Sequence, residues 1–269
     1  MSEETRVTDG RGATLPYRLV DMHCHLDRMA NADKVAADAA ARGIALFGTT
    51  VTPADALTAG ERFASAPNVR VGVGLHPWWL ADGSCDGRSA DRAALMAAQA
   101  RFVGEVGLDF SERFHGSFDV QTEAFEFIAR ACAENPVPGR AISLHAVRSA
   151  GTALDILERY GLTSSAICIF HWFSGTSDEL ARARELGCRF SVNERMLASK
   201  RGREYARQIP VDHLLLETDA PPELDSPYSA EAIEASLEAT LSKLAELRGD
   251  NRSRLAEHIA AASCELLGL

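Results

Sequence analysis

The sequence predicts a (β/α)₈ TIM barrel, a single-domain fold of the α/β class. Short apolar segments alternate with amphipathic ones along the chain, which favours a parallel sheet with helical crossovers. Eight such apolar segments are present, and the chain of 269 residues matches the about 250 residues that these barrels need. We find no linker or second domain, so we expect residues 1–17 to form a flexible extension and residues 18–269 to form the barrel.

The expected strands are short runs rich in apolar and β-branched residues, each followed by a helical segment. They cover residues 18–23, 44–51, 69–75, 102–108, 141–145, 166–171, 189–193 and 213–218.

Helical spacing of apolar residues marks the segments between the strands. In one of them, Ala124, Phe127, Ile128 and Ala131 recur three or four residues apart, which indicates one face of a helix. The expected helices include residues 33–43, closing at Gly43, residues 119–135, residues 177–187, opening on a Ser or Asp cap, and two helices within residues 229–267 around "RGDN".

The net charge of −10, from 38 acidic and 28 basic residues, argues against tight binding of long nucleic acids. Phosphate neutralisation by Lys and Arg dominates such binding, so only a local basic patch would allow it. A phosphate ester held by metal ions stays compatible with this charge.

The six cysteines are scattered without a CxxC pair, so they form neither a disulfide framework nor a zinc knuckle. We expect them to be reduced and mostly buried. The polar start "MSEETRVTDGRG" is not a signal peptide. No apolar run approaches the ~18 residues that span a bilayer, and we expect a cytoplasmic protein.

Polar residues gather where the expected strands end. His23 and His25 close the first strand, and their spacing of two places both side chains on one face. Further candidates lie in or after later strands: Glu105, His145, His171 and Asp219. A barrel brings the carboxyl ends of its strands to one mouth, where active sites are built.

Imidazole and carboxylate groups together form the ligand set of Zn²⁺, Mn²⁺ or Fe²⁺. Six candidates exceed the three protein ligands of a catalytic zinc, and they suit two ions about 3.5–4 Å apart that share a carboxylate. A lone histidine at a strand end is more often a hydrogen-bonded core residue. With His76, however, five of the eight histidines fall at expected strand ends, which favours a metal site.

Several motifs in one order make the chain resemble the TatD family of metal-dependent hydrolases, from about residue 18 to 267. They are "DMHCHLD", "GLHPWW", "GEVGLDF", "QTEAFEFIARACAE", "SLHAVRSA", "FHWFSG" and "LLLETDAPPE". The resemblance implies a TIM barrel, two divalent metal ions and hydrolytic activity, best known on DNA. The identity of the metals, Zn, Mn, Mg or Fe, stays open.

The resemblance also implies roles for single residues. His23 and His25 would hold the first metal, and His145 and His171 the second. Glu105 would bridge both ions.

Asp219 would contact a metal and take the proton of the attacking water, so Asp219 and Glu105 are the expected catalytic residues. The wider amidohydrolase group often bridges its metals with a carboxylated lysine. None of the three lysines of this chain lies at an expected strand end, so a glutamate fits the bridge.

The candidate substrate contacts are His76, Arg148, Trp172 and Arg28. Many relatives carry a His-x-Arg pattern after the fifth strand, whereas this chain has "HAVR", which places the arginine one residue further on. The segment "NERMLASKRGRE" also differs from the glycine-containing pattern of many members. Its Arg195 and Lys200 would either meet phosphate or be solvated.

Three acidic residues near the candidate ligands are candidates for hydrogen-bonding or structural support of the site. Asp21 and Glu217 share strand faces with His23 and Asp219, and either acid would suit the outer N–H of a metal-bound histidine. An ion pair in the barrel wall is an equal alternative for Glu217. Asp109 is expected to be structural or to support a ligand.

The sequence therefore predicts a TatD-like deoxyribonuclease that cleaves phosphodiester bonds, with an exonuclease-like preference for short or single-stranded substrates. The expected partner is nucleic acid or a small phosphodiester, without a membrane. Two alternatives stay open: a two-metal hydrolase of an amide, ester or lactone, and a non-catalytic barrel that works through partners.

Overall fold

Eight strands form one sheet in the order β1 to β8 in the computed structural model, which describes residues 15–269. They are β1 (Leu19–Cys24), β2 (Ile44–Thr49), β3 (Val69–Leu75), β4 (Phe102–Asp109), β5 (Ala141–Val147), β6 (Ile167–His171), β7 (Arg189–Val192) and β8 (Leu214–Leu216). The pairings of β3 with β4, β4 with β5, β5 with β6, and β6 with β7 are parallel. Sequential parallel strands with helical crossovers are the pattern of the (β/α)₈ TIM barrel, so the predicted fold class is confirmed.

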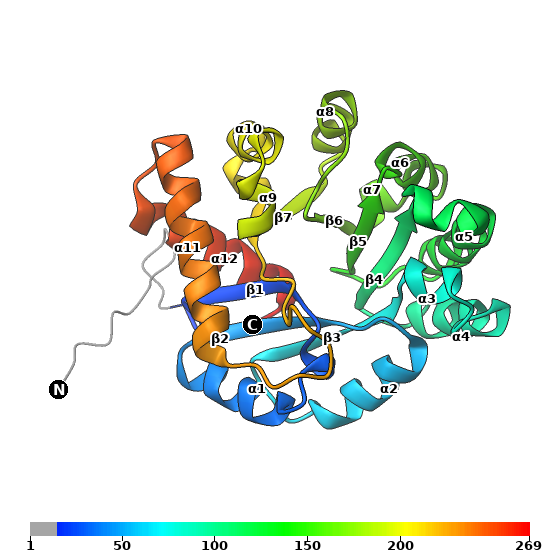
Figure 1. The fold of residues 1–269 in the computed structure, drawn as a ribbon, viewed down its shortest axis with the longest axis horizontal. Helices are drawn as coiled ribbons and strands as arrows, with labels where there is room; N and C mark the ends of the chain where they lie inside the picture. The colour runs from blue at the N-terminus through cyan, green and yellow to red at the C-terminus, as the bar shows by residue number, and fades with distance from the viewer. Residues whose placement is uncertain (1–14) are drawn as a thin grey trace. The chain divides into compact units, whose positions relative to one another are not determined.

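The helices lie between the strands and after β8. They are α1 (Ala32–Ala41), α2 (Pro53–Arg62), α3 (Pro77–Ala81), α4 (Gly87–Ala97), α5 (Phe118–Glu134), α6 (Ala150–Arg159), α7 (Leu162–Ser165), α8 (Ser177–Glu185), α9 (Glu194–Ala198), α10 (Lys200–Gln208), α11 (Ala230–Arg248) and α12 (Arg252–Leu267). Three short 3₁₀ turns are η1 (Leu26–Arg28), η2 (Glu112–Ser117) and η3 (Val211–His213). Figure 1 shows these elements coloured along the chain.

The described chain divides into two compact units. Unit 1 comprises residues 15–47, 66–69 and 192–269, and unit 2 comprises residues 48–65 and 70–191. The expected single domain stays a prediction. The expected N-terminal extension falls mostly on residues 1–14, which lie outside the described residues.

Unit 1 brings the first and last strands together. The backbone N–H of Asp219 donates to the carbonyl of His23 at 2.9 Å, and the N–H of His25 donates to the carbonyl of Ala220 at 2.7 Å. These two bonds tie the end of β1 to the loop after β8. Polar residues far apart in the sequence are therefore held side by side by backbone contacts.

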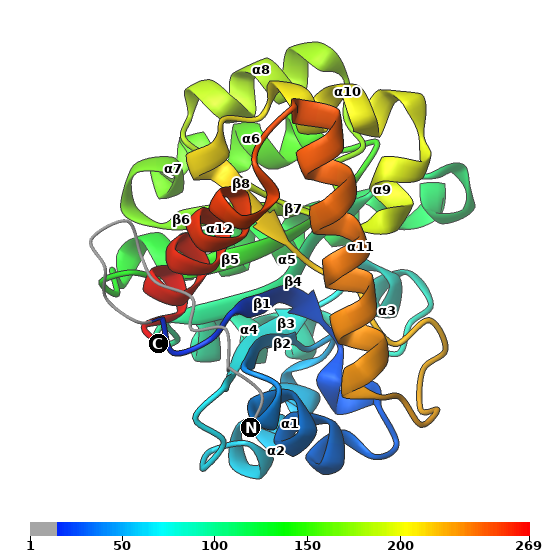
Figure 2. The same cartoon turned by 90° about the vertical axis from the view of Figure 1, so that its left-hand side faces the viewer.

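Two C-terminal helices complete unit 1 (Figure 2). Helix α12 packs on β1 and β8. Helix α11 buries Ile233, Leu237, Leu241 and Leu244, which recur at helical spacing, and ends at Gly249 in the left-handed conformation. The predicted pair of helices around "RGDN" is confirmed.

In unit 2, helix α5 packs on β4 and on α4. It buries Ala124, Phe125 and Ile128, whereas Phe127 is only half-buried. The sequence placed Phe127 and Ala131 on the core face, and this was wrong because the helix turns Phe125 and Cys132 inward instead and leaves the first two only half-buried. The cap of α8 is Thr176, one residue before the predicted Ser177 and two before the predicted Asp178, and it forms a capping box with Glu179.

Two glycines allow neighbouring strands of unit 2 to approach closely. A Cβ on Gly107, whose φ is +136°, would lie 2.1 Å from the carbonyl oxygen of His145. A Cβ on Gly74 would lie 1.6 Å from the carbonyl oxygen of Thr50 and 2.9 Å from the backbone nitrogen of Glu105. Glycine at both positions thus lets β4 lie close enough to its neighbours for Glu105 to contact His145 of β5.

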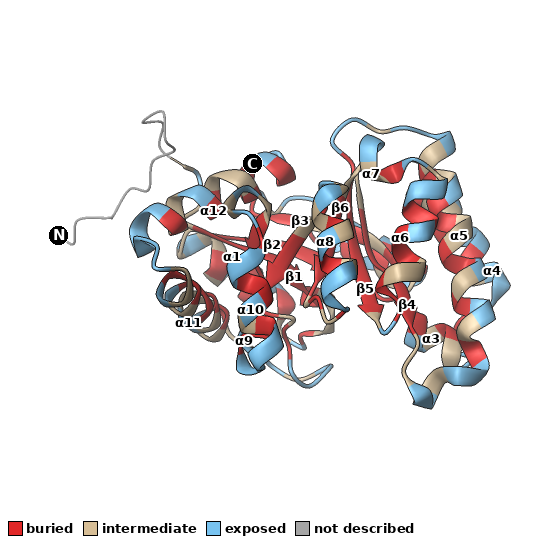
Figure 3. Cartoon of the chain, turned by 90° about the horizontal axis from the view of Figure 1, so that it is seen from above, coloured by how far each residue is buried: buried red, intermediate tan, exposed pale blue. Residues whose placement is uncertain are grey.

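The strands are the most buried part of the chain (Figure 3). Every residue of β1 and β2 is buried, as expected of parallel strands covered on both faces. All six cysteines are free and buried, which confirms the expectation from the sequence. Among the described residues, no helix is both long and apolar enough to span a membrane.

Candidate metal centre

The first polar cluster belongs to unit 1 and joins His23, His25 and Asp219. The Nε2 atoms of His23 and His25 lie 3.9 and 3.6 Å from Oδ1 of Asp219. The two imidazole rings meet edge to face with their centroids 5.3 Å apart. Both histidines are buried, while the Asp219 side chain keeps 17% of its surface exposed.

Asp21 holds the loop that carries Asp219. Its carboxylate accepts hydrogen bonds from the backbone N–H of His23 at 3.2 Å and of Thr218 at 2.9 Å, and from the Thr218 hydroxyl at 2.5 Å. Burial raises the pKa of Asp21 to about 7, although these hydrogen bonds oppose the rise. The sequence suggested an imidazole N–H as a partner of Asp21; these bonds instead give it the role of fixing the exit of β8.

A second contact of Asp219 comes from helix α9. Nη1 of Arg195 lies 3.3 Å from Oδ2 of Asp219, so the two carboxylate oxygens face different groups. Asn193, the N-cap of α9, donates from Nδ2 to Oε1 of Glu217 at 2.7 Å. The sequence left Arg195 either as a phosphate contact or as a solvated residue, because nothing in the pattern showed that α9 turns it toward Asp219.

The second polar cluster belongs to unit 2 and centres on Glu105. Nδ1 of His145 lies 2.7 Å and Nε2 of His171 lies 2.9 Å from Oε1 of Glu105. The two imidazole nitrogens are themselves 3.3 Å apart. One carboxylate oxygen from β4 and one imidazole nitrogen each from β5 and β6 therefore lie close together, and all three side chains are buried. Each of these atoms can serve as a metal ligand.

His76 also faces Glu105, with Nε2 at 3.2 Å from Oε1. Its Nδ1 accepts a hydrogen bond from the backbone N–H of Trp78 at 3.1 Å, as the cap of α3. A neutral imidazole whose Nδ1 accepts must carry its proton on Nε2. Nε2 of His76 is therefore the nitrogen that can donate to Glu105, whereas the sequence gave His76 as a candidate substrate contact.

Asp109 supports His145 from the other side of the ring. Its Oδ2 lies 3.4 Å from Nε2 of His145 and accepts the indole N–H of Trp78 at 2.6 Å. Burial alone would raise the pKa of Asp109, but the hydrogen bonds from His145, Ser111 and Trp78 hold it well below its usual range. An imidazole with a carboxylate behind it is the common arrangement around metal-bound histidines.

The donor sets of both clusters fit divalent transition metals. Each combines imidazole nitrogens with a carboxylate, the combination that Zn²⁺, Mn²⁺ and Fe²⁺ prefer. In unit 2, a buried carboxylate oxygen lies 2.7 and 2.9 Å from two imidazole nitrogens that are themselves 3.3 Å apart. Such a group is costly to bury without a proton or a cation to satisfy it.

The other residues predicted to contact substrate are not members of the two polar clusters. Arg148 is exposed directly after β5, and Trp172 is half-buried directly after β6. Arg28 lies in η1, where Nε is 3.6 Å from the carboxylate of Asp27.

Arg148, Trp172 and Asp219 have positive φ values of 54°, 39° and 56°. Non-glycine residues in this region cost about 1–3 kcal/mol each and are common at functional sites.

A family model described as "TatD related DNase" matches residues 20–268. This match covers nearly the whole chain. The chain belongs to the TatD-related DNase family. The resemblance inferred from the motifs is confirmed, and with it the predicted class of a TatD-type nuclease.

Named relatives agree with this assignment. The "3′-5′ ssDNA/RNA exonuclease TatD" of Citrobacter rodentium is 30% identical over 205 residues, covering 73% of this chain and 76% of the relative. The "Deoxyribonuclease Tat-D" of Schizosaccharomyces pombe is 33% identical over 118 residues, covering 44% and 37%. A solved TatD homologue from Escherichia coli superposes with a TM-score of 0.77 at 21% identity, covering 94% of this chain and 98% of that one, which supports the same fold.

Proposed function

We propose that this TatD-family protein is a metal-dependent nuclease that hydrolyses phosphodiester bonds from the end of a short or single-stranded nucleic acid. The observation that carries the proposal is the convergence of His145 and His171 on one buried oxygen of Glu105. The names of the relatives, a single-stranded DNA and RNA exonuclease and a deoxyribonuclease, support the substrate class.

One divalent cation would be held by Glu105, His145 and His171, and another by His23, His25 and Asp219. Bound there, the cations would supply Lewis-acid chemistry, polarising the phosphodiester and lowering the pKa of a water molecule. The identity of the metal follows from the donor sets only as far as Zn²⁺, Mn²⁺, Fe²⁺ or a harder ion such as Mg²⁺.

Asp219 is the proposed proton acceptor. It is the most exposed member of its cluster, and its Oδ1 faces two imidazole nitrogens while Oδ2 faces the Arg195 guanidinium. A carboxylate held from both sides keeps a fixed direction, which general base catalysis requires.

Glu105 is the proposed central ligand, and its neighbours fix its position. His76 donates to Oε1, and the backbone N–H of Glu105 donates to the carbonyl of Thr50 at 2.8 Å. His145 is held in turn by Asp109. These contacts orient the donor atoms before any ligand arrives.

The net charge of −10 favours a substrate that touches the protein through few phosphates. The end of a single strand meets this condition better than a long duplex. A strand end also agrees with the exonuclease activity named for the Citrobacter relative.

Metal analysis combined with a substrate panel tests the proposal. The purified protein, loaded with Mn²⁺, Mg²⁺ or Zn²⁺, is assayed on end-labelled single-stranded oligonucleotides, p-nitrophenyl phosphodiesters and lactones. We expect hydrolysis of the phosphodiesters and progressive shortening of the oligonucleotides. Hydrolysis of lactones alone, or no bound metal at any loading, would overturn the proposal.

A matched pair of variants tests the residue assignment. Glu105→Gln keeps the size of the side chain but removes its charge, so metal content and turnover should both fall by at least about 10²-fold, at the upper end of losses known around metal ligands. Glu112→Gln makes the same change at an exposed position of η2 and should behave as wild type. Wild-type turnover of a folded Glu105→Gln protein would sink the assignment.

A further inference from the structure

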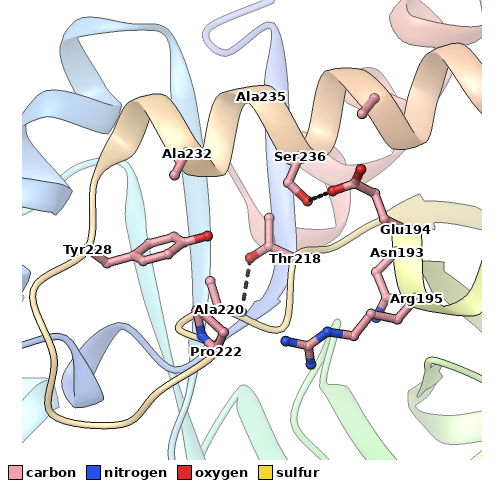
Figure 4. A pocket seen from close by; sticks show the side chains of 11 residues that line it. Asn193, Glu194, Arg195, Thr218, Ala220, Pro222, Tyr228, Ala232, Ala235 and Ser236 are labelled. Atoms are coloured by element: carbon pink, nitrogen blue, oxygen red, sulfur yellow. Dashed lines mark hydrogen bonds between the residues drawn. The ribbon is translucent and has the colours of Figure 1, made fainter.

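A pocket of about 520 Å³ opens in unit 1 beside the loop that carries Asp219. Its walls come from the start of α9, the loop after β8 and one face of α11 (Figure 4). Pockets for small organic ligands span about 300–1,000 Å³, so this one has the size for a single nucleotide.

One wall of the pocket is smooth because α11 presents only small side chains there. Ala232, Ala235 and Ala239 line it at helical spacing, and Pro222 lies on the opposite loop. Large side chains at these positions would fill the space. These alanines offer apolar contact that suits a flat group, while Ser236 of the same helix donates to the carboxylate of Glu194 at 2.8 Å.

Tyr228 and Thr218 add an aromatic ring and a polar edge. Figure 4 shows the phenol of Tyr228 reaching across the space below α11, toward the side of Thr218. The Thr218 hydroxyl is already bonded to Asp21, so it fixes the wall. Aromatic rings bind bases of any sequence by stacking, worth about 1–3 kcal/mol per base.

Arg195 connects the pocket with the first polar cluster. Its guanidinium lines the pocket and lies 3.3 Å from Oδ2 of Asp219. The side chain is 45% exposed, so an anion from solvent can approach the guanidinium. A guanidinium matches a phosphate with two parallel hydrogen bonds.

We infer that this pocket binds the base and sugar of one nucleotide next to the phosphodiester that is cleaved, with Arg195 directed at its phosphate. The inference rests on the proposed nuclease function and adds a subsite to it. The alanines of α11 and the Tyr228 ring suit the base, and the Arg195 guanidinium suits the phosphate, although the Glu194 carboxylate lines the same pocket. The volume of about 520 Å³ has the size of one nucleotide.

Binding of thymidine 5′-monophosphate to the full-length protein tests the inference without relying on turnover. Isothermal titration calorimetry gives the dissociation constants of thymidine 5′-monophosphate and of inorganic phosphate. Ala235→Trp fills the pocket and should weaken nucleotide binding by at least about tenfold. Ala37→Trp makes the same change on the exposed face of α1 and should leave binding unchanged.

The two ligands separate a nucleotide subsite from a simple phosphate site. Tighter binding of the nucleotide than of phosphate, lost in Ala235→Trp, supports the inference. Equal binding of both ligands, no nucleotide binding, or an unchanged affinity in folded Ala235→Trp would overturn it. Ala239→Trp provides a second filling variant if the first fails to fold.

Kinetics keeps the inference distinct from the proposed function. With metal-loaded protein, filling the pocket should raise the KM for a single-stranded oligonucleotide more than it lowers kcat, because the lost contact is binding energy. If the wild-type protein hydrolyses no phosphodiester, the proposed function fails. In that case the calorimetric titration still decides whether the pocket binds a nucleotide.

Discussion

Nε2 of His76 lies 3.2 Å from Oε1 of Glu105, while the other ring nitrogen of His76 caps helix α3 through the N–H of Trp78. One imidazole thus links the start of a helix to the proposed central metal ligand. The cap determines which nitrogen carries the proton, and the proton determines how Glu105 is held. The cap at the start of α3 thereby helps to orient the carboxylate of Glu105.

Removing this donor should loosen Glu105 without removing a ligand. We expect His76→Ala to lower metal affinity or turnover by about 10–100-fold, the usual effect of losing an outer partner of a ligand. His76→Asn keeps a short amide donor and should recover part of the loss. The measurement is metal affinity by competition with a chelator, followed by kcat. Equal effects of both variants would contradict the donor role.

The indole of Trp78 holds Asp109, which in turn holds His145. Trp78→Phe keeps an aromatic ring at this position and removes the N–H donor together with part of the ring area that faces Phe114 and Arg113. We expect the free energy of unfolding to fall by about 1.5–3 kcal/mol, the range for a hydrogen bond to a charged group, together with weaker metal binding. Urea titrations of the metal-free and loaded protein separate the two effects. Unchanged metal affinity would show that Asp109 holds His145 without help from Trp78.

The sequence was sufficient to predict the barrel and the polar strand ends, because both follow from local patterns. Alternation of apolar and amphipathic segments fixes the order of elements, and His23 with His25 shows its common face by spacing alone. The hydrogen bonds of Asp21 with Thr218 join residues 197 positions apart, and no local pattern reports them. The contact of Arg195 with Asp219 likewise depends on how α9 turns.

The pocket beside Asp219 escaped prediction for a different reason. It is formed by the absence of side-chain volume at Ala232, Ala235 and Ala239, and alanines at helical spacing usually mean close packing against a neighbour. Only the distance between α11 and the loop after β8 reveals that space is left there. The direction of the Tyr228 ring adds information that sequence patterns do not contain.

The cysteines should resist modification in the native protein. All six are buried, and burial raises the pKa of Cys132 to about 11 and of Cys188 to about 12, with Cys24 and Cys168 raised as well. The thiolate is the reactive form, so at pH 8 little of it is present. We expect Ellman's reagent to react slowly with native protein and to titrate six thiols after denaturation. Rapid reaction of native thiols would show that these sites open in solution.

Two glycine-to-alanine changes compare a required glycine with a dispensable one. Gly107 has a φ of +136°, and a Cβ there would lie 2.1 Å from the carbonyl oxygen of His145, so alanine must displace β4 from β5. We expect Gly107→Ala to lower the free energy of unfolding by more than about 2 kcal/mol, because backbone strain and overpacking add. Metal binding should weaken as well, since the two strands carry Glu105 and His145.

The control is Gly60→Ala in helix α2, where a Cβ meets nothing within 4 Å. Alanine favours the helix over glycine, so this variant should be more stable by up to about 1 kcal/mol. Urea denaturation followed by circular dichroism gives both values on one scale. Opposite signs would show that the close approach of β4 and β5, and not a general need for glycine, governs the effect. A neutral Gly107→Ala would mean that the strands can separate without cost, and the proposed cluster around Glu105 would then lack the rigid frame that its geometry requires.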